Sequence, residues 1–232
     1  MSYKDEFQAE NALPAESMSF GTDRFAFRAV LVTAALILTA VTIWPIQASA
    51  LNQEGGPFET ISAAALLAAG LAALYRFPGA TRLYIGLVCL LLAERELEAD
   101  IYAVGSIPFW VLNGLDTLLD MTIVRVVLAV VVVGGVVWHG MPNAWRALKQ
   151  RAPFLFVFVL AGMFAVIAQL LEEVSGMFSA DLSQVMMVRL FVLEETLEMF
   201  FSIGILAAVL IGWPKSRTEE NYHDEIAKPD PR

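Results

Sequence analysis

The chain has 232 residues, of which 58% are hydrophobic and 17% are charged, and its mean hydropathy is +0.64. A soluble domain usually carries about 25% charged residues, so this composition excludes a soluble enzyme and a disordered protein. Fifteen basic residues against 24 acidic ones, a net charge of -9, argue against nucleic-acid binding. The single cysteine, Cys89, excludes an internal disulfide and a CxxC redox pair.

The chain divides into one apolar region and two polar tails. Residues 1–26 and 214–232 are charged and poor in aliphatic side chains, so they cannot bury enough surface to fold alone and are predicted to be cytoplasmic tails. Residues 27–213 form the predicted transmembrane domain. The segment Ala48–Ala50 follows the first apolar run as a signal cleavage site would, but that run is longer than a usual signal core and follows an acidic leader. We expect the first span to be retained, with cleavage as the alternative.

Six apolar blocks fill the transmembrane domain, and each is close to the ~20 residues that cross a hydrocarbon core. They predict an all-α fold, a polytopic membrane bundle of six transmembrane helices. The predicted spans are Phe27–Ile46, Thr60–Phe77, Leu83–Leu97, Met121–Trp138, Phe154–Leu171 and Leu190–Trp213.

The basic residues predict the orientation of these spans. Twelve of the 15 fall in alternate segments, which an excess of Lys and Arg marks as cytoplasmic. They are Lys4, Arg24, Arg28, Arg76, Arg82, Arg146, Lys149, Arg151, Lys215, Arg217, Lys228 and Arg232. Both termini are therefore predicted to be cytoplasmic, in a protein of the cell (inner) membrane.

The two halves of the transmembrane domain share two short similarities. Arg28–Leu31 is similar to Arg125–Leu128, and Glu94–Glu98 is similar to Glu194–Glu198. Three spans per unit would give a 3+3 inverted repeat, the plan of many secondary transporters. The second span consists largely of small residues, which let helices pack closely within one bundle or, as the alternative, in a homo-oligomer.

Several carboxylates lie where a membrane helix should be apolar. Counted at ~1.5 Å per residue, Glu94, Glu194, Glu195 and Glu198 fall inside the hydrocarbon core, in its outer half. An isolated charge there costs at least ~2.5–3.5 kcal/mol. These groups are therefore expected to be protonated, paired with a cation or open to a wet cavity.

The spacing of the acids predicts one shared polar pocket. Glu94 with Glu98, and Glu194 with Glu198, are four residues apart and would share a helix face. Gln169 lies three and four residues before the two acids of the fifth span, Glu172 and Glu173, and would share a face with either of them. The predicted site comprises Glu94, Glu98, Glu172, Glu173, Glu194, Glu195 and Glu198, with Arg95, Arg125 and Arg189 as charge partners.

The residue types limit what this pocket could hold. The only histidines, His139 and His223, lie on the cytoplasmic side, which argues against haem, zinc and di-iron sites. Oxygen ligands suit a hard divalent cation (Ca²⁺, Mg²⁺ or Mn²⁺) or protons. The metal ligands would then be Glu94, Glu98, Glu195 and Glu198. The alternative is a structural ion-pair network that only holds the helices together.

Two outer segments are unusually apolar. Ile101–Leu119 is interrupted by Gly and Pro and predicts a short helix that lies in the outer interface and caps the pocket, with a re-entrant segment as the alternative. Apolar residues also occur in the last outer loop, which could be a lid in lipid or a docking surface for another membrane subunit. They are Met177, Phe178, Met186 and Met187.

Three functions compete at this stage. The leading hypothesis is a transporter-like protein whose outward-accessible carboxylates bind or pass a cation or a proton. The second is a non-catalytic accessory or assembly subunit of a larger membrane complex. The third is an intramembrane enzyme that uses paired carboxylates, which the lack of a nucleophile with a histidine makes less favourable. The predicted partners are the lipid bilayer and other membrane subunits, with no nucleic acid.

Overall fold

The fold was analysed in a computed structural model that describes residues 24–53, 55–76, 79, 82–97 and 99–212. Within those ranges every regular element is a helix. Three helices are long and apolar enough to cross a membrane, or four if a sharply bent pair near the N-terminus counts as one span. The predicted all-α membrane fold is confirmed at this level, whereas six spans and an inverted repeat remain predictions.

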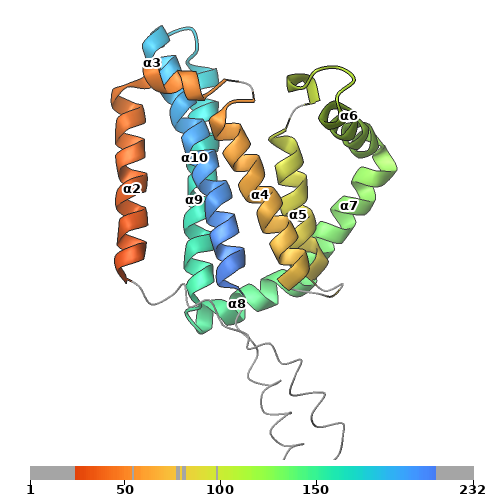
Figure 1. Cartoon of the computed structure of the whole chain (residues 1–232). Coiled ribbons are helices and arrows are strands. Elements are labelled where there is room, and N and C mark those ends of the chain that lie inside the picture. The colour runs from red at the N-terminus through yellow and green to blue at the C-terminus, as the bar shows by residue number, and fades with distance from the viewer. Residues whose placement is uncertain (1–23, 54, 77–78, 80–81, 98, 213–232) are drawn as a thin grey trace, which may run out of the picture.

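Successive long helices run in alternating directions between two ends of the molecule (Figure 1). In chain order the elements are α2 (Arg24–Ile43), α3 (Pro45–Ala48), η1 (Ser49–Leu51), α4 (Pro57–Arg76), α5 (Leu83–Arg95), η3 (Ala99–Ile101), α6 (Ile107–Asp120), α7 (Thr122–Gly135), η4 (Val136–Gly140), α8 (Met141–Lys149), α9 (Pro153–Met177) and α10 (Gln184–Ile211). We call the end where α3 and α6 lie the α6 end, and the opposite end the α8 end.

The packed centre consists of α4, α5, α9 and α10. Their shared core is built largely from small side chains, including Ala69 and Ala161, which are almost fully buried. The contacts are too close for larger residues: a Cβ added at Gly204 of α10 would lie 2.6 Å from the Cβ of Ala161 on α9. Small residues therefore allow these helix backbones to approach closely, as the sequence predicts for its second span.

Caps and prolines explain where the two longest helices begin. Pro153 occupies the first turn of α9, where its missing N–H costs nothing. The Ser183 hydroxyl accepts a hydrogen bond from the Met186 amide and caps α10. Because of this cap, α10 starts six residues before the predicted Leu190. It ends at Gly212, whose φ of 82° favours glycine.

The first predicted span, Phe27–Ile46, is bent rather than straight. Pro45 follows α2, and the helical segments on either side of the break differ in direction by 107°. Proline cannot continue the hydrogen-bond ladder of the preceding helix, which accounts for the break. In Figure 1, α2 stands beside α10 while α3 turns across the α6 end.

A continuous helical segment of 28 residues, Thr122–Lys149, connects the two ends at the edge of the bundle. The segment η4 within it is a single π-helical turn. None of the residues of α7 is buried, and most of its side chains are apolar. The predicted span Met121–Trp138 therefore corresponds to a helix with an apolar surface suited to lipid, followed by the polar-faced helix α8.

Two predicted spans differ from a simple membrane-crossing helix. The helix α5 has 13 residues and rises about 20 Å, less than the ~30 Å hydrocarbon core. The helix α10 is long enough at 28 residues, but its centre contains three glutamates. The predicted tails lie outside the described residues, apart from residues 24–26.

Candidate functional site

The centre of α10 contains the most buried carboxylate in the described part of the chain. Glu194 is 9% exposed, while Glu195 and Glu198 are half-buried. Their helix is uninterrupted there, and the hydroxyls of Thr196 and Ser202 donate to carbonyls one turn earlier in α10. The 3.6-residue period places the three acids on adjoining faces, as the sequence predicts.

Acids from other helices gather around these three. Glu195 lies close enough to interact electrostatically with Glu59 at the start of α4 and with Glu96 at the end of α5. Glu198 lies in range of Glu96, and Arg95 is a basic neighbour of both. We call this set the α10 carboxylate cluster: Glu59, Glu96, Glu194, Glu195 and Glu198, with Arg95.

The α10 carboxylate cluster lies at the level where two helices terminate. Glu59 is the third residue of α4, and its carboxylate accepts a 2.7 Å hydrogen bond from the Gly55 amide. Glu96 is the residue that follows α5. Since both approach Glu195, the cluster stands at a helix-end boundary rather than halfway along α4 and α5.

Glu94 belongs to a second acidic group. A side-chain hydrogen bond joins Glu94 to Asp116 of α6, and Asp120 is also in electrostatic range. The short helix predicted within Ile101–Leu119 is confirmed as α6, and its acidic face approaches Glu94.

The three predicted arginine partners lie in different places. Arg95 joins the α10 carboxylate cluster. Arg125 forms an exposed salt bridge with Asp120, and its Nε donates to the Leu119 carbonyl at 2.8 Å. Arg189 is half-buried, and its Nε has no hydrogen-bond partner among the described residues.

Of the remaining predicted acids, the structure describes Glu172 and Glu173. Glu172 is exposed, accepts a hydrogen bond from Gln169 and interacts electrostatically with Glu194 and Glu198. Glu173 is exposed on the same helix. Glu98 lies outside the described residues, and α5, on which its pairing with Glu94 depends, ends at Arg95.

The described residues do not form a ready-made metal centre around these acids. Among the residues that the structure describes, no group of three or more His, Cys, Asp or Glu side chains is placed to hold a metal ion. The described part of the chain thus brings the acids into electrostatic range without converging them on one point.

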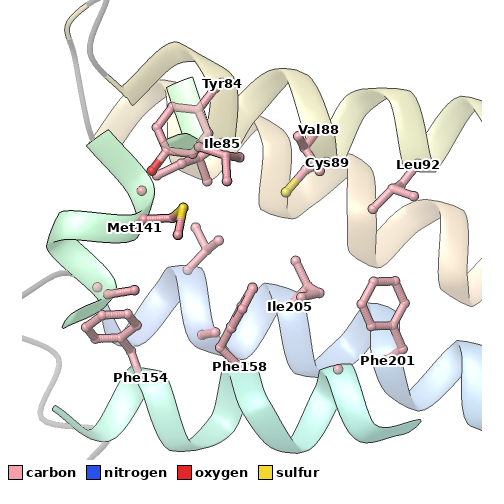
Figure 2. Close-up of a pocket in the computed structure, with 17 residues that line it drawn as sticks. Tyr84, Ile85, Val88, Cys89, Leu92, Met141, Phe154, Phe158, Phe201 and Ile205 are labelled. Atoms are coloured by element: carbon pink, nitrogen blue, oxygen red, sulfur yellow. The ribbon is translucent and has the colours of Figure 1, made fainter. Parts of the chain in front are cut away.

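An apolar cavity of about 390 Å³ lies toward the α8 end, between α5, η4, α8, α9 and α10 (Figure 2). Aromatic side chains project into it from several helices, among them Tyr84, Phe154, Phe158 and Phe201. The sulfur atoms of Cys89 and Met141 also line it. No part of the sequence analysis predicts this cavity.

Sequence reasoning also missed members of the acidic groups. Glu59 and Glu96 lie at helix ends, so their spacing from other acids along the sequence does not predict which residues they contact. Asp116 is on α6, whose four-residue spacing to Asp120 marks one acidic face. That spacing could have identified this pair, but not its contact with Glu94, because α6 and α5 meet only in the fold.

The helices and the exposed apolar surface make this chain a helical membrane protein. Comparison with family models, with curated proteins and with solved structures finds no match to it.

Proposed function

We propose that this is an integral protein of the inner membrane whose α10 carboxylate cluster binds protons and passes them toward the outer face. In this proposal the chain crosses the membrane six times with both termini in the cytoplasm. The alternating directions of the long helices (Figure 1) and the concentration of Lys and Arg in alternate segments support that topology. The α6 end then faces outward.

The composition of the α10 carboxylate cluster is the observation that supports this function. Five carboxylates from three parts of the chain form one set linked by electrostatic interactions, and among the described residues Arg95 is a basic neighbour of two of them, Glu96 and Glu198. Crowded carboxylates in a partly desolvated place cannot all be ionised at low cost, so they favour bound protons or a cation. A purely structural ion-pair network would be expected to contain similar numbers of acidic and basic side chains.

Protons suit the arrangement better than a divalent ion does. A Ca²⁺ or Mg²⁺ site needs several oxygen ligands converging on one point, at about 2.0–2.6 Å from the ion. The described residues provide no such group, as noted above. Proton exchange requires only carboxyl groups within reach of water, which the helix-end position of Glu59 and Glu96 offers.

The test is proton flux in liposomes that contain the purified full-length chain alone. With an imposed membrane potential and an internal pH dye, the wild type should acidify or alkalinise the lumen faster than protein-free vesicles. Glu198→Gln should return the rate to that baseline, whereas Glu173→Gln, an exposed acid on α9, should leave it unchanged. No flux in the wild type, or equal loss in both variants, would contradict the proposal.

The same preparations distinguish a metal from a proton. Thermal unfolding is measured with Ca²⁺, Mg²⁺, Mn²⁺ or chelator. A bound ion would stabilise the wild type by about 2.7 kcal/mol at 100 times its dissociation constant. If an ion raises the unfolding temperature of the wild type and Glu198→Gln abolishes that rise, the ligand of the cluster is this ion and not a proton.

A second candidate function, an accessory subunit, is favoured by the tip of the α9–α10 hairpin. This tip extends past the level of Glu195, and Met177, Phe178 and Val185 are exposed there. Exposed apolar side chains that lie beyond the level where α4 begins and α5 ends could be covered by a protein partner. Purification in mild detergent should then recover a stoichiometric second membrane chain, which Met177→Glu should release. Recovery of a lone protein active in liposomes would exclude this function.

A further inference from the structure

The cavity near the α8 end differs from an ordinary packing defect in size and shape. Its volume of about 390 Å³ lies within the ~300–1,000 Å³ that is typical of small-molecule sites. Figure 2 shows it extending along the helices, from Met141 and Phe154 at one end to Leu92 and Phe201 at the other. Along α5, the distance from Tyr84 to Leu92 corresponds to about 12 Å.

The lining indicates an apolar occupant. Apart from the Tyr84 hydroxyl and the thiol of Cys89, the side chains around the cavity are hydrocarbon or thioether. A water molecule needs two to four polar partners, so a cavity lined in this way stays dry or takes up an apolar molecule.

The cavity opens sideways between η4, α8 and α9. Three of its lining residues, Val136, Met141 and Phe158, are also exposed on the outside of the bundle, at 39%, 62% and 52%. The helices that frame this opening include Thr122–Lys149 and α9, both long and apolar enough to cross a membrane. The opening therefore faces the lipid, whose hydrocarbon chains are the most abundant apolar groups available.

A positively charged side chain, Arg76, lies next to one end of the cavity. Gly212 lines the cavity, and the guanidinium of Arg76 lies against it, 3.0 Å from the position of an added Cβ. The same guanidinium donates to the Leu210 carbonyl, which fixes its position. The helix α8 adds Arg146 and Lys149 at this end of the bundle.

We propose that the cavity binds one acyl chain of an anionic membrane phospholipid, with its phosphate at the Arg76 end. Hydrocarbon fills the dry interior, and the guanidinium of Arg76 pairs with the phosphate, for which arginine geometry is well suited. Arg76 is the last residue of α4, at the same end of the bundle as the polar-faced helix α8 (Figure 1), where a lipid would change from chain to headgroup.

The local backbone is built around this space. The Tyr84 ring packs against Gly135 and Gly140, and a Cβ at Gly135 would lie 2.5 Å from it. These glycines flank or end the π-helical turn η4, whose residues Val136 and Gly140 line the cavity. Single π-helical turns are often associated with functional sites. The glycines and the turn thus make room for the Tyr84 ring, which forms one wall of the cavity and keeps the helices apart.

The experiment uses a variant that fills the cavity. Gly162 lines it, and a Cβ there would meet no atom within 4 Å, so Gly162→Leu occupies the space without a backbone clash. Gly176→Leu on the same helix is the matched control, because its Cβ also meets nothing and it does not line the cavity. Native mass spectrometry of protein released from phosphatidylglycerol nanodiscs should show one retained lipid for the wild type and for Gly176→Leu, and none for Gly162→Leu.

A second arm tests the headgroup. In nanodiscs with equal phosphatidylglycerol and phosphatidylcholine, the wild type should retain mainly the anionic lipid, and Arg76→Gln should remove that preference. Equal retention by Gly162→Leu and the wild type would overturn the proposal. Retention of an isoprenoid or another neutral lipid from native membranes in place of phospholipid would overturn it as well.

Cys89 provides a measurement that needs no variant. It is the only cysteine in the chain, is 4% exposed and lines the cavity. An apolar maleimide should label it slowly in phosphatidylglycerol vesicles and faster after delipidation in detergent. Labelling at the same rate in both, with the fold intact by thermal unfolding, would show that no lipid chain covers the cavity.

Discussion

The same helices form an acidic cluster at one end of this bundle and an apolar cavity at the other. Toward the α6 end, α5 and α10 bring acids together around Arg95. Toward the α8 end, the same two helices contribute Tyr84, Cys89 and Ile205 to an almost entirely apolar cavity. The difference arises from position along each helix, since one helix can present carboxylates in one turn and hydrocarbon two turns later.

This contrast shows how a small membrane protein can separate charge from lipid. The acids lie where α4 begins and α5 ends, so free backbone amides are close to them, as the bond from the Gly55 amide to Glu59 shows. The cavity lies where the helices run side by side, and only side chains define its walls. Each end can therefore be changed without direct contact with the other, and the following experiments use that independence.

The largest expected difference between the two ends is the side of the membrane that each one faces. A reporter enzyme that is active only outside the cytoplasm should be active when fused at residue 110 or 180 and inactive at residue 146. The reason is the excess of Lys and Arg around α8. Activity at 146, or none at 110 and 180, would reverse the orientation and place the acids at the cytoplasmic face.

A substitution between the two ends should weaken the bundle that they share. In Gly204→Leu, the new side chain meets Ala161, and overpacking of this kind costs about 1–3 kcal/mol. Thermal or denaturant unfolding in detergent would measure the loss. The control is Gly176→Leu, where the added side chain has open space and should change the free energy of unfolding by less than about 0.5 kcal/mol. Equal stability of the two variants would contradict the close α9–α10 contact.

Removal of Arg95 should destabilise the acidic end in a pH-dependent way. At pH 8 the ionised acids lose their basic neighbour and repel one another, so Arg95→Gln should lower the free energy of unfolding by up to about 1 kcal/mol. At pH 4 the carboxyls are largely neutral, and the difference from the wild type should shrink. A difference that stays constant between these pH values would indicate that Arg95 acts through packing rather than charge.

The smallest effect is expected at Arg125. Both members of its salt bridge with Asp120 are exposed, with side-chain exposures of 64% and 74%. Such pairs contribute about 0.2–1 kcal/mol, and salt weakens them. Arg125→Gln should therefore cost less than Arg95→Gln in low salt and almost nothing in high salt. A large loss would mean that Arg125 supports a buried acid after all.

The sequence predicts the long helices of this fold better than it predicts their ends. Apolar runs and Pro153 locate α9, but the run alone predicts an end at Leu171, six residues before Met177. Hydropathy falls at Glu172 and Glu173, while the backbone continues as helix because nothing there breaks it. The bend after α2 follows from Pro45, yet its angle depends on how α3 packs against α10.

The candidate site could be predicted only where its members share one helix. The acids of α10 follow from spacing, since their contacts are set by the helical period. Glu96 and Asp116 could not be assigned, because their neighbours come from the fold of α5 against α6 and α10. The cavity gives no sequence signal, since a residue such as Phe158 is equally suited to a packed core, to lipid or to a cavity wall.

The shortness of α5 makes bilayer thickness a variable that acts on this protein. In the proposed six-span topology α5 crosses the bilayer. Because its thirteen residues rise only about 20 Å against a hydrocarbon core of ~30 Å, surrounding lipid would have to thin locally by about 10 Å to match the helix. Each ångström of hydrophobic mismatch costs a fraction of a kcal/mol. Short-chain lipids relieve that cost and long-chain or sterol-rich bilayers increase it. In that topology thin membranes favour the fold, and the length of the host lipids would set how far water can approach the turn that follows Arg95.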